Sequence, residues 1–307
     1  MTGIKIEDIA FIGFRAPDLG RMRVFMEDFG AVVAQQDERR LFMRGAGAAP
    51  FVHVTELGEP GFAMVGFRAE SLEDLERLAS EENQTPAPLD APGGGMFIDL
   101  TDPDGHTVRV VAGQRKSEPL PFDEPAAWNF ARHKPRLRSA KRIEQGPPQI
   151  VRLGHCVLGV SDFPTSEKWY KSRFGFITSD EAEAAPGVAV GAFMRCDRGE
   201  TPTDHHTLFL AQLPAGPGFN HAAFEVRDVE DVLAGHNLLK AKDYEQAWGI
   251  GRHYLGSQVF DYWRDPWGHT VEHWTDGDMF TAADGSNKAT MAEVLGVQWG
   301  PAMPADF

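Results

Sequence analysis

Apolar runs recur along the chain, and each is followed by an amphipathic segment. Residues 9–14 form a continuous apolar run, which predicts a buried strand, and Pro17-Asp18 then precedes a helical pattern that continues through Phe25 to Phe29. Residues 153–160 predict another such strand, with Ser161 or Asp162 as the N-cap of a helix over 163–174 that ends at Gly175. The order of strand and helix therefore occurs twice.

The same order returns later in each half of the chain. Residues 62–67 predict a strand before an acidic helix that starts near Ser71, and residues 221–226 predict a strand before a helix that starts near Val229. Aligning the two halves on these patterns predicts two copies of one structural unit.

An eight-residue motif strengthens this repeat and contains one informative change. Residues 102–109 read DPDGHTVR, and residues 265–272 read DPWGHTVE. Glu272 thus replaces Arg109, and a carboxylate in only one copy suggests that only the later copy kept a metal. The histidine inside the motif is present in both copies, which favours a structural role at the turn for His269.

Two histidines complete a candidate ligand set with Glu272. In the aligned halves His155 falls opposite Phe11, and His221 falls opposite Met64. Two imidazoles and one carboxylate hold non-haem Fe(II) and leave the opposite coordination positions open. A single histidine in an apolar strand is usually a hydrogen-bonded core residue, but three polar residues at equivalent repeat positions favour a metal site.

The motifs around these ligands resemble those of the type I extradiol ring-cleavage dioxygenases, members of the vicinal oxygen chelate superfamily. The matching segments are Gly154-His155, Asn220 to Phe224, and Gly249 to Glu272. The resemblance implies an α+β fold of two tandem vicinal oxygen chelate domains. Each domain is expected to consist of paired βαβββ modules that form a curled sheet, with the metal in the C-terminal domain.

This resemblance also implies a division of the chain. We expect an N-terminal domain without a metal site at 1–113, a linker rich in Pro, Lys and Arg at 114–149, a catalytic metal-binding domain at 150–275, and a tail at 276–307 with a short helix near 289–295.

Three further residues match positions that surround the metal in that family. His206 matches the acid/base histidine, and His253 and Tyr262 match residues that hydrogen-bond the substrate or an intermediate. Because alternate residues of a strand face opposite sides, only one of His205 and His206 is expected on the inner face. The family pattern selects His206, so His205 is expected to face solvent.

Composition limits the classes of function. A chain of 307 residues is long enough for two compact domains with a core each, and 42% hydrophobic and 24% charged residues are typical of soluble globular proteins. The net charge of −15 argues against nucleic acid or an anionic membrane surface as a partner. Two cysteines in apolar or mixed surroundings, and a start without a basic segment and apolar run, predict a reduced, cytoplasmic protein.

The resemblance implies extradiol (meta) cleavage of a catechol or substituted catechol with O2, giving a ring-opened semialdehyde or keto acid. Fe(II) is the expected cofactor, and Mn(II) would bind the same hard ligands. A homo-oligomer is also implied. Two alternatives stay open: a metal-dependent lyase or isomerase of the glyoxalase or epimerase type, and a non-catalytic small-molecule-binding member of the superfamily.

Overall fold

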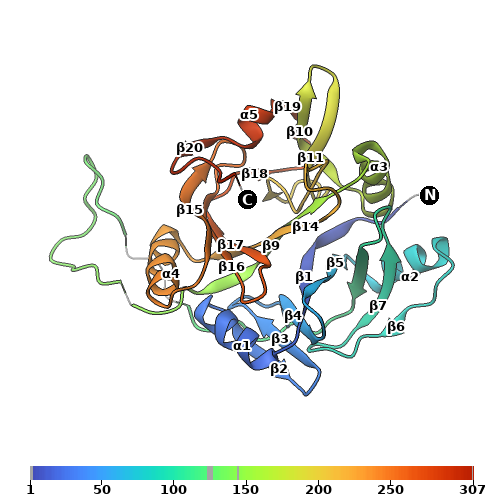
Figure 1. The fold of residues 1–307 in the computed structure, drawn as a ribbon, viewed down its shortest axis with the longest axis horizontal. Helices are drawn as coiled ribbons and strands as arrows, with labels where there is room; N and C mark the ends of the chain where they lie inside the picture. Colours follow the sequence, from blue (N-terminus) through green and yellow to red (C-terminus); the bar gives the residue numbers. More distant parts are fainter. Residues whose placement is uncertain (1–2, 123–126, 144, 306) are drawn as a thin grey trace.

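The computed structural model describes residues 3–122, 127–143, 145–305 and 307. Its strands form two large sheets, one in each half of the chain, which lie side by side (Figure 1). No helix within these described ranges is long and apolar enough to cross a membrane.

The N-terminal sheet contains eight strands in the order β2-β3-β4-β1-β5-β8-β7-β6. Two βαβββ modules meet in its middle, where β1 pairs antiparallel with β5. The elements are β1 (Ile6–Ala16), α1 (Leu19–Asp28), β2 (Val32–Gln36), β3 (Arg40–Arg44), β4 (His53–Leu57), β5 (Gly61–Ala69), α2 (Leu72–Glu81), β6 (Ala87–Pro88), β7 (Met96–Thr101) and β8 (Thr107–Ala112).

The C-terminal half repeats this plan with a sheet of ten strands in the order β19-β10-β11-β13-β9-β14-β17-β16-β15-β20, and β12 and β18 pair as a separate small sheet. The predicted α+β fold of two domains with paired βαβββ modules is therefore confirmed. The elements are β9 (Ile150–Gly159), α3 (Phe163–Phe174), β10 (Ile177–Ala185), β11 (Val188–Arg195), β12 (Thr203–Asp204), β13 (Leu208–Ala211), β14 (Gly218–Val226), α4 (Val229–Ala241), β15 (Gln246–His253), β16 (Val259–Arg264), β17 (Thr270–Thr275), β18 (Met279–Phe280), β19 (Asn287–Thr290), α5 (Met291–Val294) and β20 (Val297–Trp299).

Local capping explains where the helices begin and end. The Asp162 carboxylate accepts a hydrogen bond from the backbone N–H of Thr165, which satisfies one free donor of the first turn of α3. Gly175 ends that helix with φ of 68°, a left-handed conformation that glycine adopts without strain. The predicted helix over 163–174 is thus confirmed at both ends.

One face of the N-terminal sheet holds the residues that the repeat aligns with the candidate ligands. Gly66 of β5 pairs with Phe11 of β1 on one side and with Arg109 of β8 on the other. Met64 lies two residues before Gly66, so its side chain shares their face of the sheet. Phe11, Met64 and Arg109 therefore meet on three adjacent strands.

The other faces of the two sheets share one continuous core. Ile12 and Phe14 of β1 belong to the same buried cluster as Cys156 and Leu158 of β9. Strand periodicity predicts that these residues are buried, but it does not tell which surface covers them.

Two helices reach across from one domain to the other and explain this shared core. The Tyr244 hydroxyl donates to the Asp28 carboxylate at the end of α1, at 2.8 Å. In the opposite sense the Tyr170 hydroxyl of α3 donates to the Asp102 carboxylate of the N-terminal domain, at 3.0 Å. Each of α1 and α3 thus has one side in contact with the opposite domain.

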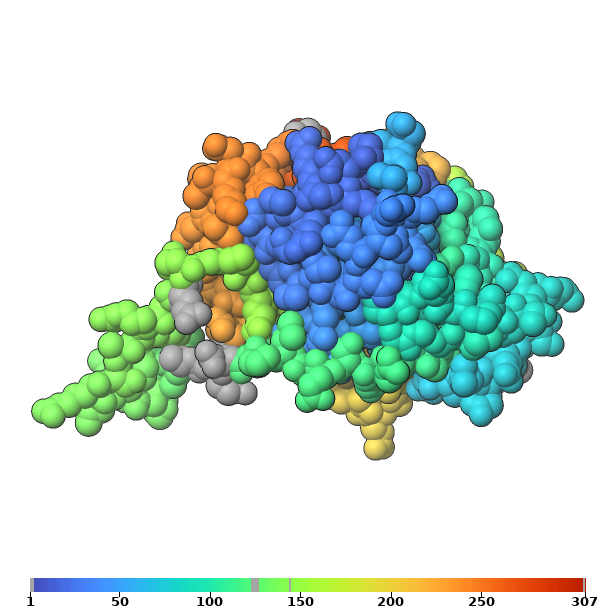
Figure 2. Space-filling view, turned by 90° about the horizontal axis from the view of Figure 1, so that it is seen from below, coloured from blue at the N-terminus to red at the C-terminus, as the bar shows by residue number. Residues whose placement is uncertain are grey.

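The connection and the tail differ in how they pack. In the described residues between β8 and β9 there is no helix or strand, and residues 127–143 form an arm that extends away from the rest of the molecule (Figures 1 and 2). The tail instead extends the C-terminal sheet, because β19 pairs with β10 and β20 pairs with β15. The predicted short tail helix is confirmed as α5.

Candidate metal centre

The three predicted ligands meet on adjacent strands of the C-terminal sheet. Ala223 of β14 pairs with His155 of β9 and with Glu272 of β17, and His221 lies two residues before Ala223. This arrangement repeats that of the N-terminal sheet position by position and confirms the predicted alignment of the two halves.

The ligand atoms of these side chains lie within 4.8 Å of one another. Nε2 of His155 is 3.3 Å from Oε2 of Glu272, and Nε2 of His221 is 3.5 Å from the same oxygen. All three side chains are buried. Two imidazole nitrogens and a carboxylate oxygen therefore converge on one small volume inside the curled sheet.

Glu272 is a buried carboxylate. Its side chain is fully buried, and within the described part of the chain neither carboxylate oxygen has a hydrogen-bond partner. Burial alone would raise its pKa, but the nearby imidazoles of His155, His253 and His221 hold that pKa well below its usual range. Such a charge is strongly unfavourable unless a cation satisfies it. The donor set therefore fits a divalent metal ion.

His221 is prepared as a neutral ligand. Its Nδ1–H donates to Oδ1 of Asn220 at 2.6 Å, which leaves the lone pair on Nε2, the nitrogen near Glu272. Burial lowers the pKa of His221 to about 3, so the ring is uncharged near neutral pH.

Packing of Trp274 explains why a glycine, Gly154, directly precedes His155. A Cβ atom at this position would lie 2.5 Å from Cζ2 of Trp274, too close for any side chain. The missing side chain lets the Trp274 ring pack against β9, where its centroid is 6.1 Å from that of His155. Trp274 thereby supports the strand that presents the ligand.

The equivalent position of the N-terminal domain is filled with side chains. The Phe11 ring packs on Phe51 at 4.7 Å, and the Arg109 guanidinium pairs with both carboxylate oxygens of Asp99 at 2.7 Å. Only about 30 Å³ of free space remains there. Phe11 and Met64 thus replace the two imidazoles, and Arg109, paired with Asp99, replaces the carboxylate.

The three further predicted residues surround the ligands. The His206 ring centroid is 4.0 Å from that of His155, and the Tyr262 ring stands edge-on to His221 at 5.1 Å. Nε2 of His253 lies 2.9 Å from the Tyr262 hydroxyl. The structure therefore brings all six predicted site residues around one centre.

The expectation that His205 faces solvent is wrong. Its side chain is buried, with Nε2 2.5 Å from Oδ2 of Asp180 and Nδ1 3.0 Å from Nδ1 of His206. Strand alternation does not apply to it, because residues 205–207 form an irregular segment between β12 and β13. Sequence reasoning also missed Asp180, which no motif in the sequence links to His206.

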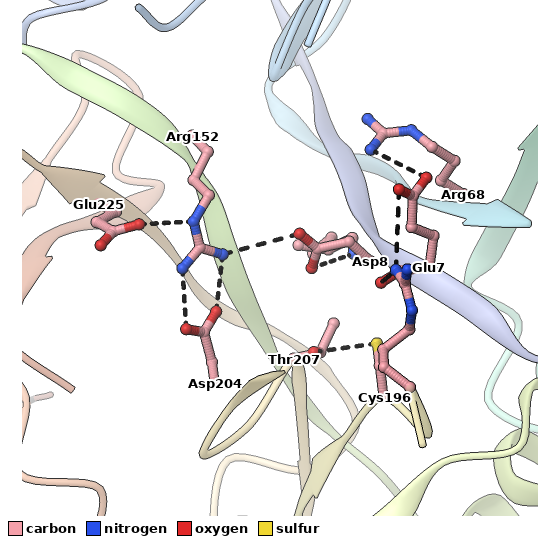
Figure 3. Close-up of polar contacts among 10 residues, drawn as sticks. Glu7, Asp8, Arg68, Arg152, Cys196, Asp204, Thr207 and Glu225 are labelled. Atoms are coloured by element: carbon pink, nitrogen blue, oxygen red, sulfur yellow. Dashed lines mark hydrogen bonds and ion pairs between the residues drawn. The ribbon is translucent and has the colours of Figure 1, made fainter. Parts of the chain in front are cut away.

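An ion-pair cluster anchors this irregular segment (Figure 3). The Arg152 guanidinium forms two hydrogen bonds with the Asp204 carboxylate, at 2.7 and 2.9 Å, and a third with Glu225 at 2.6 Å. Asp8 of the N-terminal domain lies 3.8 Å from the same guanidinium. Arg152 thus ties the segment that carries His206 to β14 and to the other domain.

A cavity of about 500 Å³ opens onto the ligands. Its walls are mostly apolar and include Phe193, Phe209 and Trp248. The tail closes part of it, because the Phe307 ring packs on Tyr262 at 4.9 Å and Trp248 Nε1–H donates to the Pro301 carbonyl at 3.0 Å. This contribution of the tail was not foreseen from the sequence.

The profile of the Glyoxalase/Bleomycin resistance protein/Dioxygenase superfamily matches residues 152–273, the region that contains all three candidate ligands. Over 98% of this chain and 91% of the relative, the sequence is 29% identical to metapyrocatechase 2 of Cupriavidus necator. The predicted resemblance to the extradiol dioxygenases of the superfamily is confirmed.

Solved structures share the fold of this chain. A Mn(II)-bound glyoxalase from Novosphingobium aromaticivorans matches with a TM-score of 0.79 and 23% identity, over 98% of this chain and 93% of that chain. Homoprotocatechuate 2,3-dioxygenase from Arthrobacter globiformis matches with a TM-score of 0.76 and 19% identity, over 95% and 86% of the two chains. These likenesses extend through both sheets.

Proposed function

We propose that the chain cleaves a catechol ring by the extradiol route, using O2 and a metal held by His155, His221 and Glu272. Relatives named metapyrocatechase 2 and iron-dependent extradiol dioxygenase support this enzyme class. The observation that carries the proposal is the convergence of two imidazoles and one donor-free carboxylate on a cavity that His206 and Tyr262 also line.

Fe(II) is the metal that we propose, and Mn(II) suits the same ligands. When bound, the metal would orient the substrate oxygens and stabilise developing negative charge. His155 and His221 line the cavity, so a metal held by them and Glu272 would be within reach of a bound substrate.

His206 is our candidate for moving the catechol protons. Burial, together with the neighbouring His155, lowers its pKa well below the usual range, so the ring is neutral and can accept a proton. The wall of the cavity beside it is apolar, which keeps water away from the proton that is transferred.

Tyr262 and His253 form a hydrogen-bonded pair on the other side of the centre, 2.9 Å apart. Burial and the nearby Glu272 charge raise the pKa of Tyr262 well above its usual value, so the hydroxyl keeps its proton. We propose that this hydroxyl donates a hydrogen bond to an oxygen of the bound substrate, with His253 holding its orientation.

The cavity favours an uncharged substrate. None of the described residues that line it is Lys, Arg, Asp or Glu. A carboxylate on the catechol ring would be buried there without a cationic partner, at a cost of about 3 kcal/mol, or roughly 100-fold in kcat/KM. We therefore propose catechol itself or a catechol with an apolar substituent.

We propose that 150–275 is the catalytic domain and that the tail at 276–307 closes part of the cavity. In this proposal the domain at 1–113 has no metal site, and 114–149 is the linker. Cys156 and Cys196 are both buried and unpaired, which suits a reducing, cytoplasmic location. We also propose a homo-oligomer, which sedimentation velocity would test.

The test is oxygen uptake by protein reconstituted anaerobically with Fe(II). One O2 consumed per methylcatechol, a yellow ring-opened product, and loss of both in His155→Ala would support the proposal. A carboxylated catechol should react at least about 100-fold more slowly. Tight metal binding with no uptake on any catechol would refute ring cleavage and favour the lyase, isomerase or binding-protein alternative.

A further inference from the structure

Three buried side chains form a hydrogen-bonded line that ends at the cavity. Oδ2 of Asp180 lies 2.5 Å from Nε2 of His205, and Nδ1 of His205 lies 3.0 Å from Nδ1 of His206. All three side chains are buried, and His206 lines the cavity. Asp180 comes from β10, so the line joins an outer strand to the metal centre.

The direction of each hydrogen bond follows from the chemistry of Asp180. Burial would raise the pKa of this carboxyl, but hydrogen bonds from His205 and Asn287 and the nearby Arg195 charge hold it below the usual range. An ionised carboxylate only accepts, so Nε2 of His205 must carry a proton. When this is the one proton on the His205 ring, Nδ1 of His205 is an acceptor, and the proton between the two rings belongs to Nδ1 of His206.

A neutral imidazole protonated at Nδ1 has its lone pair at Nε2. Among the described residues no hydrogen bond engages Nε2 of His206, whose ring borders the cavity. We propose that Asp180 and His205 are positioning residues that hold His206 as its Nδ1–H tautomer, with a bare Nε2 directed to the substrate. The tautomer of His206 does not depend on the proposed function, and only its role as a base in ring cleavage rests on that function.

The backbone around His206 is anchored independently of this line. Arg152 holds Asp204 (Figure 3). The His205 N–H donates to the Asp278 carbonyl at 2.9 Å, and the Thr207 N–H donates to the Met194 carbonyl at 2.7 Å. A purely structural function for Asp180 would therefore duplicate existing contacts. The property that depends on Asp180 is the position of the proton on each ring.

The proton positions can be observed without any assay of catalysis. Long-range ¹H–¹⁵N correlation spectra distinguish the two tautomers of each histidine in protein labelled with ¹⁵N-histidine and loaded with diamagnetic Zn(II). The His206 signals are assigned by their loss in His206→Asn. We expect the wild-type protein to show His205 protonated at Nε2 and His206 protonated at Nδ1.

Asp180→Asn removes the charge that sets the direction of the line, so His206 should shift toward the Nε2–H tautomer. In the Fe(II) enzyme kcat should fall about 10- to 100-fold with little change in KM, because the base is lost and the substrate site is kept. The matched control is Glu183→Gln, which also neutralises a β10 carboxylate facing β19, where Glu183 pairs with Lys288. The control should change neither the tautomer nor kcat.

A wild-type spectrum with His206 protonated at Nε2 would overturn the inference whether or not the enzyme cleaves catechols. Equal losses of kcat in Asp180→Asn and Glu183→Gln would overturn it as well. The expected tautomer in a protein that consumes no O2 would support the positioning while refuting the proposed function.

Discussion

His53 lies on β4, in the shared core, with its imidazole fully buried. Among the residues that the structure describes, none forms a hydrogen bond with either ring nitrogen. Burial lowers its pKa from 6.5 to about 3. Because the pKa is lower in the folded state, the unfolded chain binds the proton first as the pH falls below 6.5. The contribution of neutral His53 to the free energy of unfolding is therefore fully present above pH 6.5 and is lost as the pH falls toward 3.

The size of this decline follows from the shift. Each pH unit between the two pKa values is worth about 1.36 kcal/mol, so lowering the pH from 6.5 to 4.5 should remove about 2.7 kcal/mol through His53 alone. His221 and His273 are buried with pKa values of about 3 and about 4 and add to the loss in the same sense. The contribution of His53 must therefore be isolated by substitution.

The contribution of His53 is measured by urea unfolding at pH 7 and at pH 4.5. The two proteins compared are the metal-free wild type and the metal-free His53→Gln variant. The variant cannot take up the proton at this position, so its free energy of unfolding should fall with pH by about 2–3 kcal/mol less than that of the wild type. Equal declines in the two proteins would refute the assignment of a neutral, desolvated His53.

Three further predictions concern the site. Glu272→Gln removes the only anionic ligand and should lower the affinity for Fe(II) or Mn(II) at least about 100-fold by calorimetry, and unchanged affinity would contradict the ligand assignment. Tyr262→Phe should retain the metal but lose about 10- to 100-fold in kcat, and wild-type turnover would exclude the hydroxyl from catalysis. Gly154→Ala places a Cβ 2.5 Å from Trp274 and should destabilise the protein by about 1–3 kcal/mol, seen as a lower Tm, while an unchanged Tm would show that the indole is not confined.

The repeat made much of the fold and the ligand set predictable. Aligning two copies of a module matches positions on the same face of equivalent strands, and the registers place Phe11 and His155 alike. Helix α3 was predictable to the residue, because Asp162 and Gly175 mark its ends through local backbone chemistry. Local signals of this kind do not depend on the rest of the fold.

Features that depend on distant contacts were not predictable. The burial of His205 follows from Asp180, 25 positions away, and from an irregular segment in which alternation fails. Phe307 reaches the cavity because the tail adds strands to the edges of the second sheet. In the same way, the stacking of Phe29 on His273 across the domains depends on packing that periodicity does not specify.

The most direct test of the central claim is the fate of the oxygen atoms. Fe(II)-loaded protein is mixed with a methylcatechol under ¹⁸O2, and the ring-opened product is analysed by mass spectrometry after rapid quenching and reduction of any aldehyde. Extradiol cleavage at a metal held by His155, His221 and Glu272 predicts a product that contains both atoms of one O2 molecule. An unlabelled product, or oxidation to a quinone with no oxygen incorporated, would contradict it.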